Sequence, residues 1–429
     1  MVIRRKLKHG ERGQVLILCA VFMVVLMLFV GLAIDFGFAY VTKARLGKAV
    51  DAAALACARY SAQGSTQSQA LAQSTFDLNY TTSDRDTAPP VVTIPPFTTD
   101  ASGNTLINIS ASVTTKTFFI GLLPSFRTLN VSSAAQSRAA TVLMTLVLDR
   151  TGSMGPVSSG GDGGEAMMPG AVSDFISYFD DTKDSVALVS FANDVTVDVP
   201  MTTGNFRQAV INATNSMVAR GATWSDGALQ QALVQENKLT LPAGVYKTVV
   251  FFTDGNANTL QETVTCNGGT EKTGTWNIGG SDNSSWIGFL VPNTNPSTIS
   301  FPNCAEGGDP SDTSCCHNGT FYSHVAGKQM PLNWTNIAGT AAPYGDALYR
   351  AIADADAMRA QGITVYSIGL ASAPASVNQA FLCQIANAPC SPAYDPTKPV
   401  GDMVLAQTAS GLAQAFQTVA TEIRLRLTQ

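Results

Sequence analysis

The longest apolar run of the chain lies close to its N-terminus. From Val15 to Ile34 no residue is charged, and a helix of that length, at about 1.5 Å per residue, spans roughly the 30 Å of a bilayer core. The competing interpretation is a cleaved signal peptide, whose apolar region is usually only about 7–15 residues long. The pattern therefore favours an uncleaved transmembrane helix over residues 15–40. Asp35, at its outer end, is expected either at the membrane interface or against another membrane helix.

The helical pattern continues beyond this run. Leu46, Val50 and Ala53 recur at helical spacing, so one helix of about 45 residues is expected to reach from the membrane to near Gly64 as a stalk. Apolar and polar residues then alternate, first around Ile107, Ile109, Ala111 and Val113 and again around Leu129, Val131, Ser133 and Ala135. Residues 41–140 are therefore predicted to form a stalk helix and a small helix-plus-hairpin unit.

From Thr141 the pattern changes to continuous apolar strands that alternate with helical stretches. Such strands are typical of a parallel sheet that is covered on both faces, so a doubly wound α/β domain is predicted for residues 141–429. The predicted strands are Leu143–Leu148, Val186–Phe191, Val249–Phe252 and Ile363–Ile368, with an edge candidate at Val195–Val199. The predicted helices are Ala171–Phe179, Phe206–Val218, Asp226–Glu236, Gly345–Ala360 and Gly411–Leu425.

A stretch rich in Gly, Asn, Ser and Thr interrupts this domain at about 256–342. It is far longer than an ordinary loop, so it is interpreted as an insertion, either stapled by disulfides or partly disordered. Four of the eight cysteines lie in it: Cys266, Cys304, Cys315 and Cys316. A zinc cluster with His317 is the alternative to disulfides there. Cys383 and Cys390, on either side of Pro389, are expected to form a local disulfide.

Charge sets the expected topology. The tail of residues 1–14 carries Arg4, Arg5, Lys6, Lys8 and Arg12, which favours a cytoplasmic N-terminus, although three basic residues beyond the membrane run weaken the asymmetry. Without the tail's five basic residues and Glu11, 21 Lys and Arg oppose 30 Asp and Glu, a net charge of about −9. That balance argues against nucleic acid as a partner. The three histidines belong to no hydrolase motif.

Oxygen-bearing side chains follow two of the predicted strands and one loop. Asp149, Thr151 and Ser153 come directly after Leu143–Leu148, Asp254 ends the strand Val249–Phe252, and Thr223 precedes a helix. Each alone could be a helix cap or a turn. Because the carboxyl ends of parallel strands share one edge of a sheet, these residues together predict a site for a hard divalent cation, Mg²⁺ or Mn²⁺.

The order of these residues resembles von Willebrand factor A domains, which carry Asp-x-Ser/Thr-x-Ser, a loop Thr and a fourth-strand Asp. The resemblance implies that Thr151, Ser153 and Thr223 bind the metal directly, while Asp149 and Asp254 act mainly through water. Thr151 replaces the serine of many members and adds a methyl group. The glycine-rich run Gly160–Gly164 lengthens the loop after the motif.

A second resemblance lies in the N-terminal part. Glu11-Arg12-Gly13-Gln14, Gly31-Leu32-Ala33-Ile34-Asp35 and the Ala-rich segment Lys48–Ala56 resemble the TadE/TadG-type segment of tight-adherence (Flp) pilus assembly. The closing residues 423–428 are similar to the end of TadG-type proteins. The resemblance implies a single-pass inner-membrane protein, with a periplasmic or extracellular C-terminal domain, that works with pilus or secretion machinery.

The expected activity is binding rather than catalysis: the metal would complete its shell with a carboxylate from a protein or surface ligand. One alternative is an envelope enzyme that uses the metal as a Lewis acid, for which Asp226 and Glu165 are the nearby acids available as a base. Another is a metal-free structural stalk.

Overall fold

The computed structural model describes residues 12–100, 103–240, 244–265, 271–278, 287–290, 320–331, 342–371 and 377–427. The chain divides into two compact units. The first contains residues 1–100 and 105–139, and the second contains residues 140–427.

The first unit begins with the long helix expected from the sequence. Helix α1 (Arg12–Arg59) is long and apolar enough to cross a membrane, and side chains from Val15 to Val30 point outward without partners in the fold. A short 3-10 turn (Ser61–Gln63) and Gly64, with φ of 100°, follow the helix. Because positive φ is readily adopted by glycine, Gly64 suits the break between α1 and α2 (Ser65–Asn79).

The outer part of α1, predicted as a stalk helix, is one layer of a folded unit. Leu46, Val50, Ala53 and Cys57 are fully buried. They pack with Phe76 of α2 against a hairpin of β3 (Thr105–Lys116) and β4 (Thr128–Ala139). The helical spacing of small apolar residues allows α1 to lie flat on the hairpin. Short strands β1 (Val91–Thr93) and β2 (Thr98–Thr99) pair with β3.

The second unit is a doubly wound α/β fold, as predicted. Its six-stranded sheet has the order β15-β14-β8-β5-β6-β7, in which β7 pairs antiparallel with β6 and the other neighbours pair in parallel. The strands are β5 (Val142–Asp149), β6 (Ser185–Phe191), β7 (Val195–Thr203), β8 (Tyr246–Thr253), β14 (Thr364–Leu370) and β15 (Met403–Ala406).

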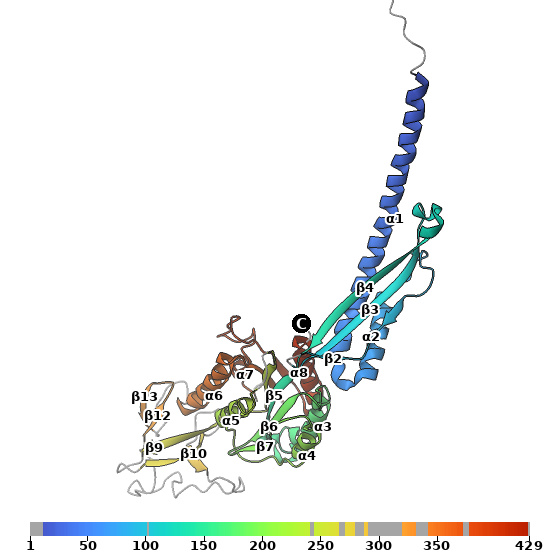
Figure 1. The fold of residues 1–429 in the computed structure, drawn as a ribbon. Helices are drawn as coiled ribbons and strands as arrows, with labels where there is room; N and C mark the ends of the chain where they lie inside the picture. The colour runs from blue at the N-terminus through green and yellow to red at the C-terminus, as the bar shows by residue number, and fades with distance from the viewer. Residues whose placement is uncertain are drawn as a thin grey trace, which may run out of the picture. The chain divides into compact units, whose positions relative to one another are not determined.

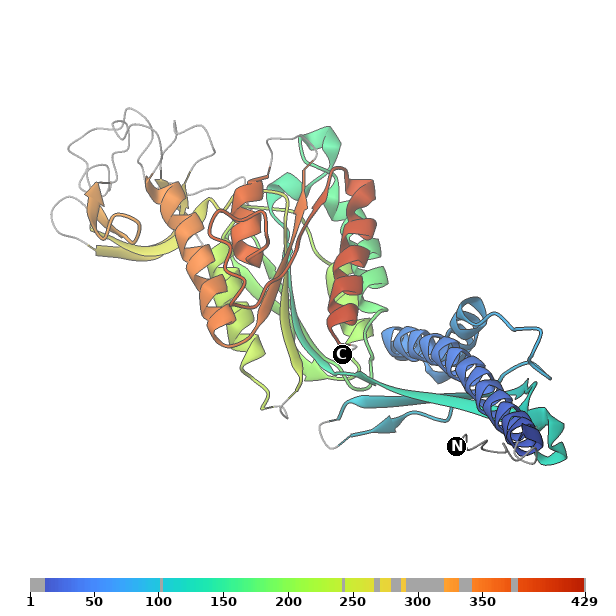
Figure 2. The same cartoon turned by 90° about the horizontal axis from the view of Figure 1, so that it is seen from above.

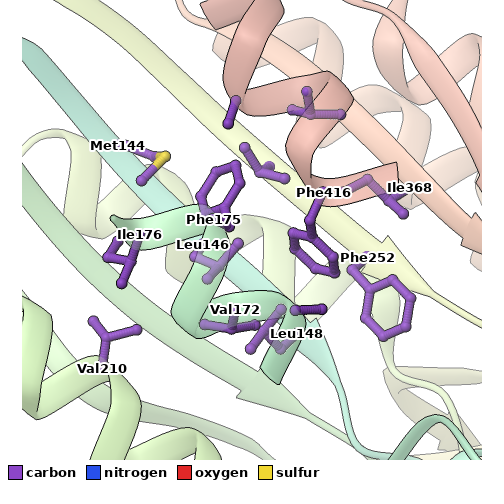
Figure 3. Close-up of a cluster of buried hydrophobic side chains, with 14 of the residues drawn as sticks. Met144, Leu146, Leu148, Val172, Phe175, Ile176, Val210, Phe252, Ile368 and Phe416 are labelled. Atoms are coloured by element: carbon purple, nitrogen blue, oxygen red, sulfur yellow. The ribbon is translucent and has the colours of Figure 1, made fainter. Parts of the chain in front are cut away.

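Helices cover both faces of this sheet (Figures 1 and 2). One face carries α3 (Gly164–Ile176), α4 (Arg207–Asn215) and α8 (Leu412–Arg426), and the other carries α5 (Ser225–Glu236), α6 (Ala342–Ala360) and α7 (Gln379–Ala386). Successive residues of β8 serve the two faces, as alternation along a strand requires. Phe252 meets Phe416 of α8 at 5.6 Å between ring centroids, as Figure 3 shows, whereas Phe251 meets Phe381 of α7 at 6.5 Å.

The described parts of the insertion form a second, antiparallel sheet rather than irregular chain. Its order is β11-β10-β9-β12-β13, and Leu260 and Phe321 join it to the core beneath α5 and α6. The strands are β9 (Thr259–Thr265), β10 (Glu271–Ile278), β11 (Ile287–Leu290), β12 (Thr320–Ser323) and β13 (Lys328–Pro331). The four cysteines of the insertion lie outside the described residues, so their pairing and the zinc alternative stay predictions.

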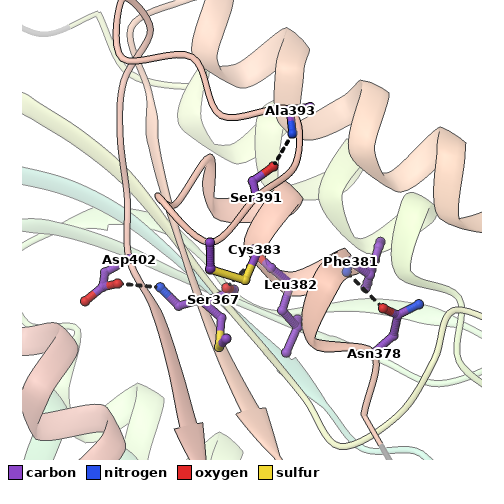
Figure 4. The surroundings of a disulfide bond; sticks show 10 residues. Ser367, Asn378, Phe381, Leu382, Cys383, Ser391, Ala393 and Asp402 are labelled. Atoms are coloured by element: carbon purple, nitrogen blue, oxygen red, sulfur yellow. Dashed lines mark hydrogen bonds between the residues drawn. A yellow bond between two sulfur atoms is a disulfide. The ribbon is translucent and has the colours of Figure 1, made fainter.

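The expected disulfide between Cys383 and Cys390 is confirmed (Figure 4). It links the buried Cys383 in the middle of α7 to the loop that follows the helix, seven residues further along the chain. Cys57, by contrast, is a free thiol in the core of the first unit.

Replacing both Cys383 and Cys390 by alanine should lower the free energy of unfolding by about 2 kcal/mol. The reason is that the disulfide closes a short loop and so removes limited entropy from the unfolded chain. Denaturant unfolding followed by tryptophan fluorescence measures the loss, with the reduced wild type as control. The same midpoint in the double variant and in the oxidised wild type would rule out a stabilising role.

Glu236, at the end of α5, is a fully buried carboxyl that predicts a pH dependence of stability. Oε1 accepts a hydrogen bond of 2.8 Å from Thr145, and Oε2 has no partner in the described chain. Burial raises the pKa of Glu236 to about 8, against the opposing effect of the Thr145 bond. The folded form therefore keeps a proton that the unfolded chain loses, so stability falls as the pH rises from the ordinary value of 4.5 to about 8.

Glu236→Gln should flatten part of this decline. Below about pH 4.5 the variant and the wild type should be similarly stable, and above pH 8 the variant should be more stable by about 3–5 kcal/mol because it buries no charge. Urea unfolding across this range measures the difference. Parallel stability curves for the two proteins would contradict the assignment of the buried proton to Glu236.

Candidate metal site

Two neighbouring parallel strands bring the acids of the site to one edge of the sheet. In β5 and β8, Leu148 lies opposite Phe252. Asp149 is the last residue of the first strand, Thr253 is the last residue of the second, and Asp254 follows it directly. Strand β5 is buried throughout, and β8 is buried from Thr248 to Thr253. Asp149 is 0% exposed and Asp254 is 2% exposed. The apolar strands thus position two acids at their carboxyl ends, as the sequence predicted.

The turn after β5 adds two hydroxyl groups. The backbone N–H of Thr151 donates to Asp149 Oδ1 at 2.7 Å, which folds the turn back over the strand end. Ser153 Oγ donates to Asp254 Oδ1 at 2.7 Å and lies 2.9 Å from Thr151 Oγ1, which itself lies 3.3 Å from Asp254 Oδ1. Thr151 is buried, whereas Ser153 is exposed at the surface.

Thr223 enters from the loop before α5. Its backbone N–H donates to Asn258 Oδ1 at 2.7 Å, and its carbonyl accepts from the N–H of Asn258 at 3.0 Å. A Cβ placed on Gly255 would lie 3.8 Å from Thr223 Oγ1 and 3.9 Å from Ser153 Oγ, so both hydroxyls border the space above this glycine. The structure thus brings together all five residues that the sequence singled out.

The buried acids are electrostatically unfavourable without a cation. Burial raises the pKa of Asp254 to about 8, and the negative charges of Asp149 and Asp162 add to this shift. The hydrogen bond from Ser153 opposes the shift. Burial also raises the pKa of Asp149, although hydrogen bonds from Thr253 and Thr151 oppose the shift. Asp254 Oδ2 is buried and has no hydrogen-bond partner in the described chain.

The adjacent guanidinium does not neutralise these acids. Arg150 forms an ion pair of 2.9 Å with Asp194, and its Nε donates to Ser190 at 3.1 Å. Arg220 also contacts Asp194, at 3.5 Å. The basic side chains next to the motif are therefore directed toward Asp194.

The donor set suits a hard divalent cation. A hydroxyl that donates its proton to a carboxylate still presents lone pairs, so Thr151 and Ser153 can bond Asp254 and a cation together. Oxygen donors with few carboxylates are what Mg²⁺ and Mn²⁺ accept. Among the described residues no three His, Cys, Asp or Glu side chains gather for a metal, so any site here must use these hydroxyls.

Three further residues belong to this site and were missed from the sequence. The hydroxyl of Thr253 donates to Asp149 Oδ2, and Asn258 Oδ1 accepts a hydrogen bond from the backbone N–H of Thr223. The negative charge of Asp162 raises the pKa of Asp254. Thr253 and Asn258 lie within four residues of Asp254 in the sequence, which is the signal that could have pointed to them. Asp162 lies within the glycine-rich run, where spacing alone gives no such signal.

The two acids considered as catalytic bases have structural environments of their own. Glu165 accepts a hydrogen bond of 3.0 Å from the backbone N–H of Ala219. Asp226 lies buried in the first turn of α5, where burial and Asp354 raise its pKa to about 7.

Two sequence-family models match the chain. The von Willebrand factor type A domain matches residues 144–256, which contain all five site residues. The Flp pilus-assembly TadE/G-like family matches residues 13–59, which lie in α1. No curated protein matches the chain.

Solved structures similar to this chain include two pilus proteins. The vWF domain of the type V pili tip protein Mfa5 from Porphyromonas gingivalis is 17% identical, covering 68% of this chain and 97% of that one, with a TM-score of 0.39. The pilus adhesin SpaC from Lactobacillus rhamnosus GG is 17% identical, covering 74% and 33%, with a TM-score of 0.39.

A third similar structure is proximal thread matrix protein 1 from the mussel byssus, solved with a zinc-occupied MIDAS motif. It is 13% identical, covering 67% of this chain and 46% of that one, with a TM-score of 0.36. The chain spans less than half the length of this protein and of SpaC. The chain thus combines a segment that matches the TadE/G-like Flp pilus-assembly family with a domain that matches the von Willebrand factor type A family, on a doubly wound α/β fold.

Proposed function

We propose that this protein is a membrane-anchored component of a tight-adherence (Flp-type) pilus assembly or secretion system. Its von Willebrand factor type A domain binds a partner protein or surface ligand through a divalent cation, Mg²⁺ or Mn²⁺. Thr151, Ser153 and Thr223 hold the ion directly, and Asp149 and Asp254 act mainly through water. The TadE/G-like match supports the pilus context, and the apolar helix α1 supports the anchor.

One observation carries the metal-dependent part of the proposal. Two buried carboxylates meet at the ends of β5 and β8, and Asp254 Oδ2 has no partner in the described chain. Burying unpaired negative charge is costly, so such a pair needs either a proton or a cation. The hydroxyls that bond Asp254 also provide the oxygen ligands that a hard cation prefers.

The exposure of Ser153 explains how a partner reaches the ion. A cation at this edge keeps coordination positions toward solvent, and a carboxylate from the partner can replace water there. The interaction requires no bond to be broken. The alternative of an envelope enzyme needs an accessible acid as a base. Glu165 already accepts a hydrogen bond from the Ala219 N–H, and Asp226 is buried in α5, so neither residue supports this alternative.

The proposed orientation has a cytoplasmic N-terminus, because five basic residues precede the apolar run. A reporter that is active only after export should therefore be active when it is fused after Tyr60. A reporter that works only in the cytoplasm should be silent at the same site. The opposite pair of results would contradict the topology and, with it, the exported position of the domain.

Complementation of a deletion strain tests the proposed function. The wild type and Asp174→Ala, a change at an exposed acid of α3, should restore pilus assembly or adherence. The double variant Ser153→Ala/Thr223→Ala should not restore it at equal protein level, since two metal ligands are lost. Full complementation by the double variant would contradict a functional metal site.

A further inference from the structure

The connection between β3 and β4 exposes an unusual set of apolar side chains. This segment, residues 117–126, is called the tip below, and it contains no charged residue. Five of its six large apolar side chains are at least 45% exposed, namely Phe118 (59%), Phe119 (45%), Leu122 (78%), Leu123 (58%) and Phe126 (52%), and Ile120 is half-buried. Contiguous exposed aromatic and aliphatic groups on this scale mark an interaction surface.

The tip lies beside the outer end of the apolar run of α1 (Figure 1). A Cβ on Gly31 would lie 2.5 Å from Cβ of Phe119, so the missing side chain at Gly31 lets the tip touch the helix. Asp35 accepts hydrogen bonds from the backbone N–H groups of Phe118 (2.9 Å) and Ile120 (2.8 Å). The carboxylate of Asp35 is therefore used within the unit, whereas its place at a membrane interface or against another membrane helix stays a prediction.

Gly31 belongs to the run of residues 15–34, which is long enough to span the hydrocarbon core. The contacts of Gly31 and Asp35 therefore place the tip alongside the last turns of that run. The residues of α1 directly before Gly31 are also apolar and exposed, with Phe29 at 68% and Val30 at 51%. Whatever solvent covers the end of the run also covers the tip.

The backbone of the tip is suited to an apolar solvent. Besides the bonds to Asp35, hydrogen bonds within 3-10 turns satisfy further backbone N–H groups. The N–H of Leu122 donates to the carbonyl of Phe119 at 3.3 Å, that of Leu123 to Ile120 at 3.1 Å, and that of Phe126 to Leu123 at 2.9 Å. In hydrocarbon each unsatisfied backbone group costs several kcal/mol, so such internal pairing is a requirement for insertion.

Cationic groups mark the border of the tip. The guanidinium of Arg85 lies 3.3 Å from the ring centroid of Phe38 and 4.3 Å from that of Phe118. Lys116 and Arg127 flank the tip in the sequence and are exposed. Basic groups at the edge of an apolar surface are favourable next to anionic phospholipid headgroups.

We propose that the tip inserts into the same bilayer that α1 crosses, on the side where α1 leaves it. The occupant of this surface is phospholipid. The inference rests on the proposed membrane anchor and adds a second membrane contact, which holds the hairpin of β3 and β4 at the bilayer and fixes which side of α1 faces the folded unit.

Photo-crosslinking of the full chain in phospholipid nanodiscs tests this insertion. The photoreactive residue p-benzoylphenylalanine replaces Leu122 in the tip, Phe22 within the run, or Leu55, which is 50% exposed on α1 about 30 Å beyond Asp35. After illumination, Phe22 and Leu122 variants should gain the mass of one phospholipid. The Leu55 variant should show no such gain.

The three positions separate the failure of the inference from the failure of the anchor. A lipid adduct at Phe22 without one at Leu122 would overturn the insertion of the tip and leave the anchor intact. Absence of lipid adducts at both would overturn both. A protein adduct instead of lipid at Leu122, when illumination is repeated in native membranes, would assign the surface to a partner chain and likewise overturn the inference.

Discussion

Asp149→Ala should weaken binding of Mg²⁺ or Mn²⁺ by about 10–100-fold, the range found when residues that support metal ligands are removed. Asp149 is buried and accepts hydrogen bonds from Thr151 and Thr253, so its loss removes a balancing charge and loosens the turn that carries two ligands. Thr151→Ser keeps the hydroxyl oxygen and should change the affinity much less. Calorimetric titration of the full-length protein measures the affinities.

Asp174→Ala is the matched control, because it removes an exposed acid elsewhere in the domain and should leave the metal affinity unchanged. Circular dichroism of the metal-free proteins distinguishes loss of the site from loss of the fold. Equal metal affinity in folded wild type and folded Asp149→Ala would contradict the role given to this carboxylate.

Gly401→Ala should cost about 3 kcal/mol or more of unfolding free energy, which is the cost of forcing atoms into a filled core. A Cβ at this position would lie 1.8 Å from the backbone oxygen of Val365 in β14 and 3.0 Å from that of Ala386. The N–H of Gly401 also donates to Ala386 at 2.9 Å. Backbone at the edge of the sheet must therefore move to accept a methyl group. Denaturant unfolding measures the loss.

Gly170→Ala is the matched control for this prediction. Gly170 lies within α3, and a Cβ there would meet nothing within 4 Å. Alanine is favoured over glycine in a helix, so the change should raise stability by up to about 1 kcal/mol. Equal stabilities for the two alanine variants would contradict the close approach at Gly401.

The sheet of the second unit was predictable because its strands are buried on both faces. The strand Leu143–Leu148 and its parallel neighbours consist of continuous apolar residues, which do not suit solvent-facing elements. In contrast, β15 (Met403–Ala406) has four residues and is mostly half-buried, so it gives little hydrophobic signal. The bounds of helix α2 were not predicted because its polar sequence buries few side chains, among them Ala72 and Phe76.

The candidate site was predictable as far as the positions of its residues depend on strand ends. Asp149 and Asp254 follow two adjacent apolar strands, so the sheet brings them together. The influence of Asp162 on Asp254 depends on how the glycine-rich loop folds. In this loop the backbone N–H of Asp162 donates to the carbonyl oxygen of Ser153 at 2.7 Å. Local sequence does not specify this loop conformation. The partners of Asp35 lie more than eighty residues away in the sequence.

The central claim is that a divalent cation occupies the edge of the sheet between the three hydroxyls. Anomalous diffraction from crystals of the protein grown with Mn²⁺ tests it most directly. The account predicts one peak about 2–2.5 Å from the hydroxyl oxygens of Thr151, Ser153 and Thr223, with Asp149 and Asp254 behind them. A map without a peak there, at Mn²⁺ concentrations that fill other sites, would contradict it.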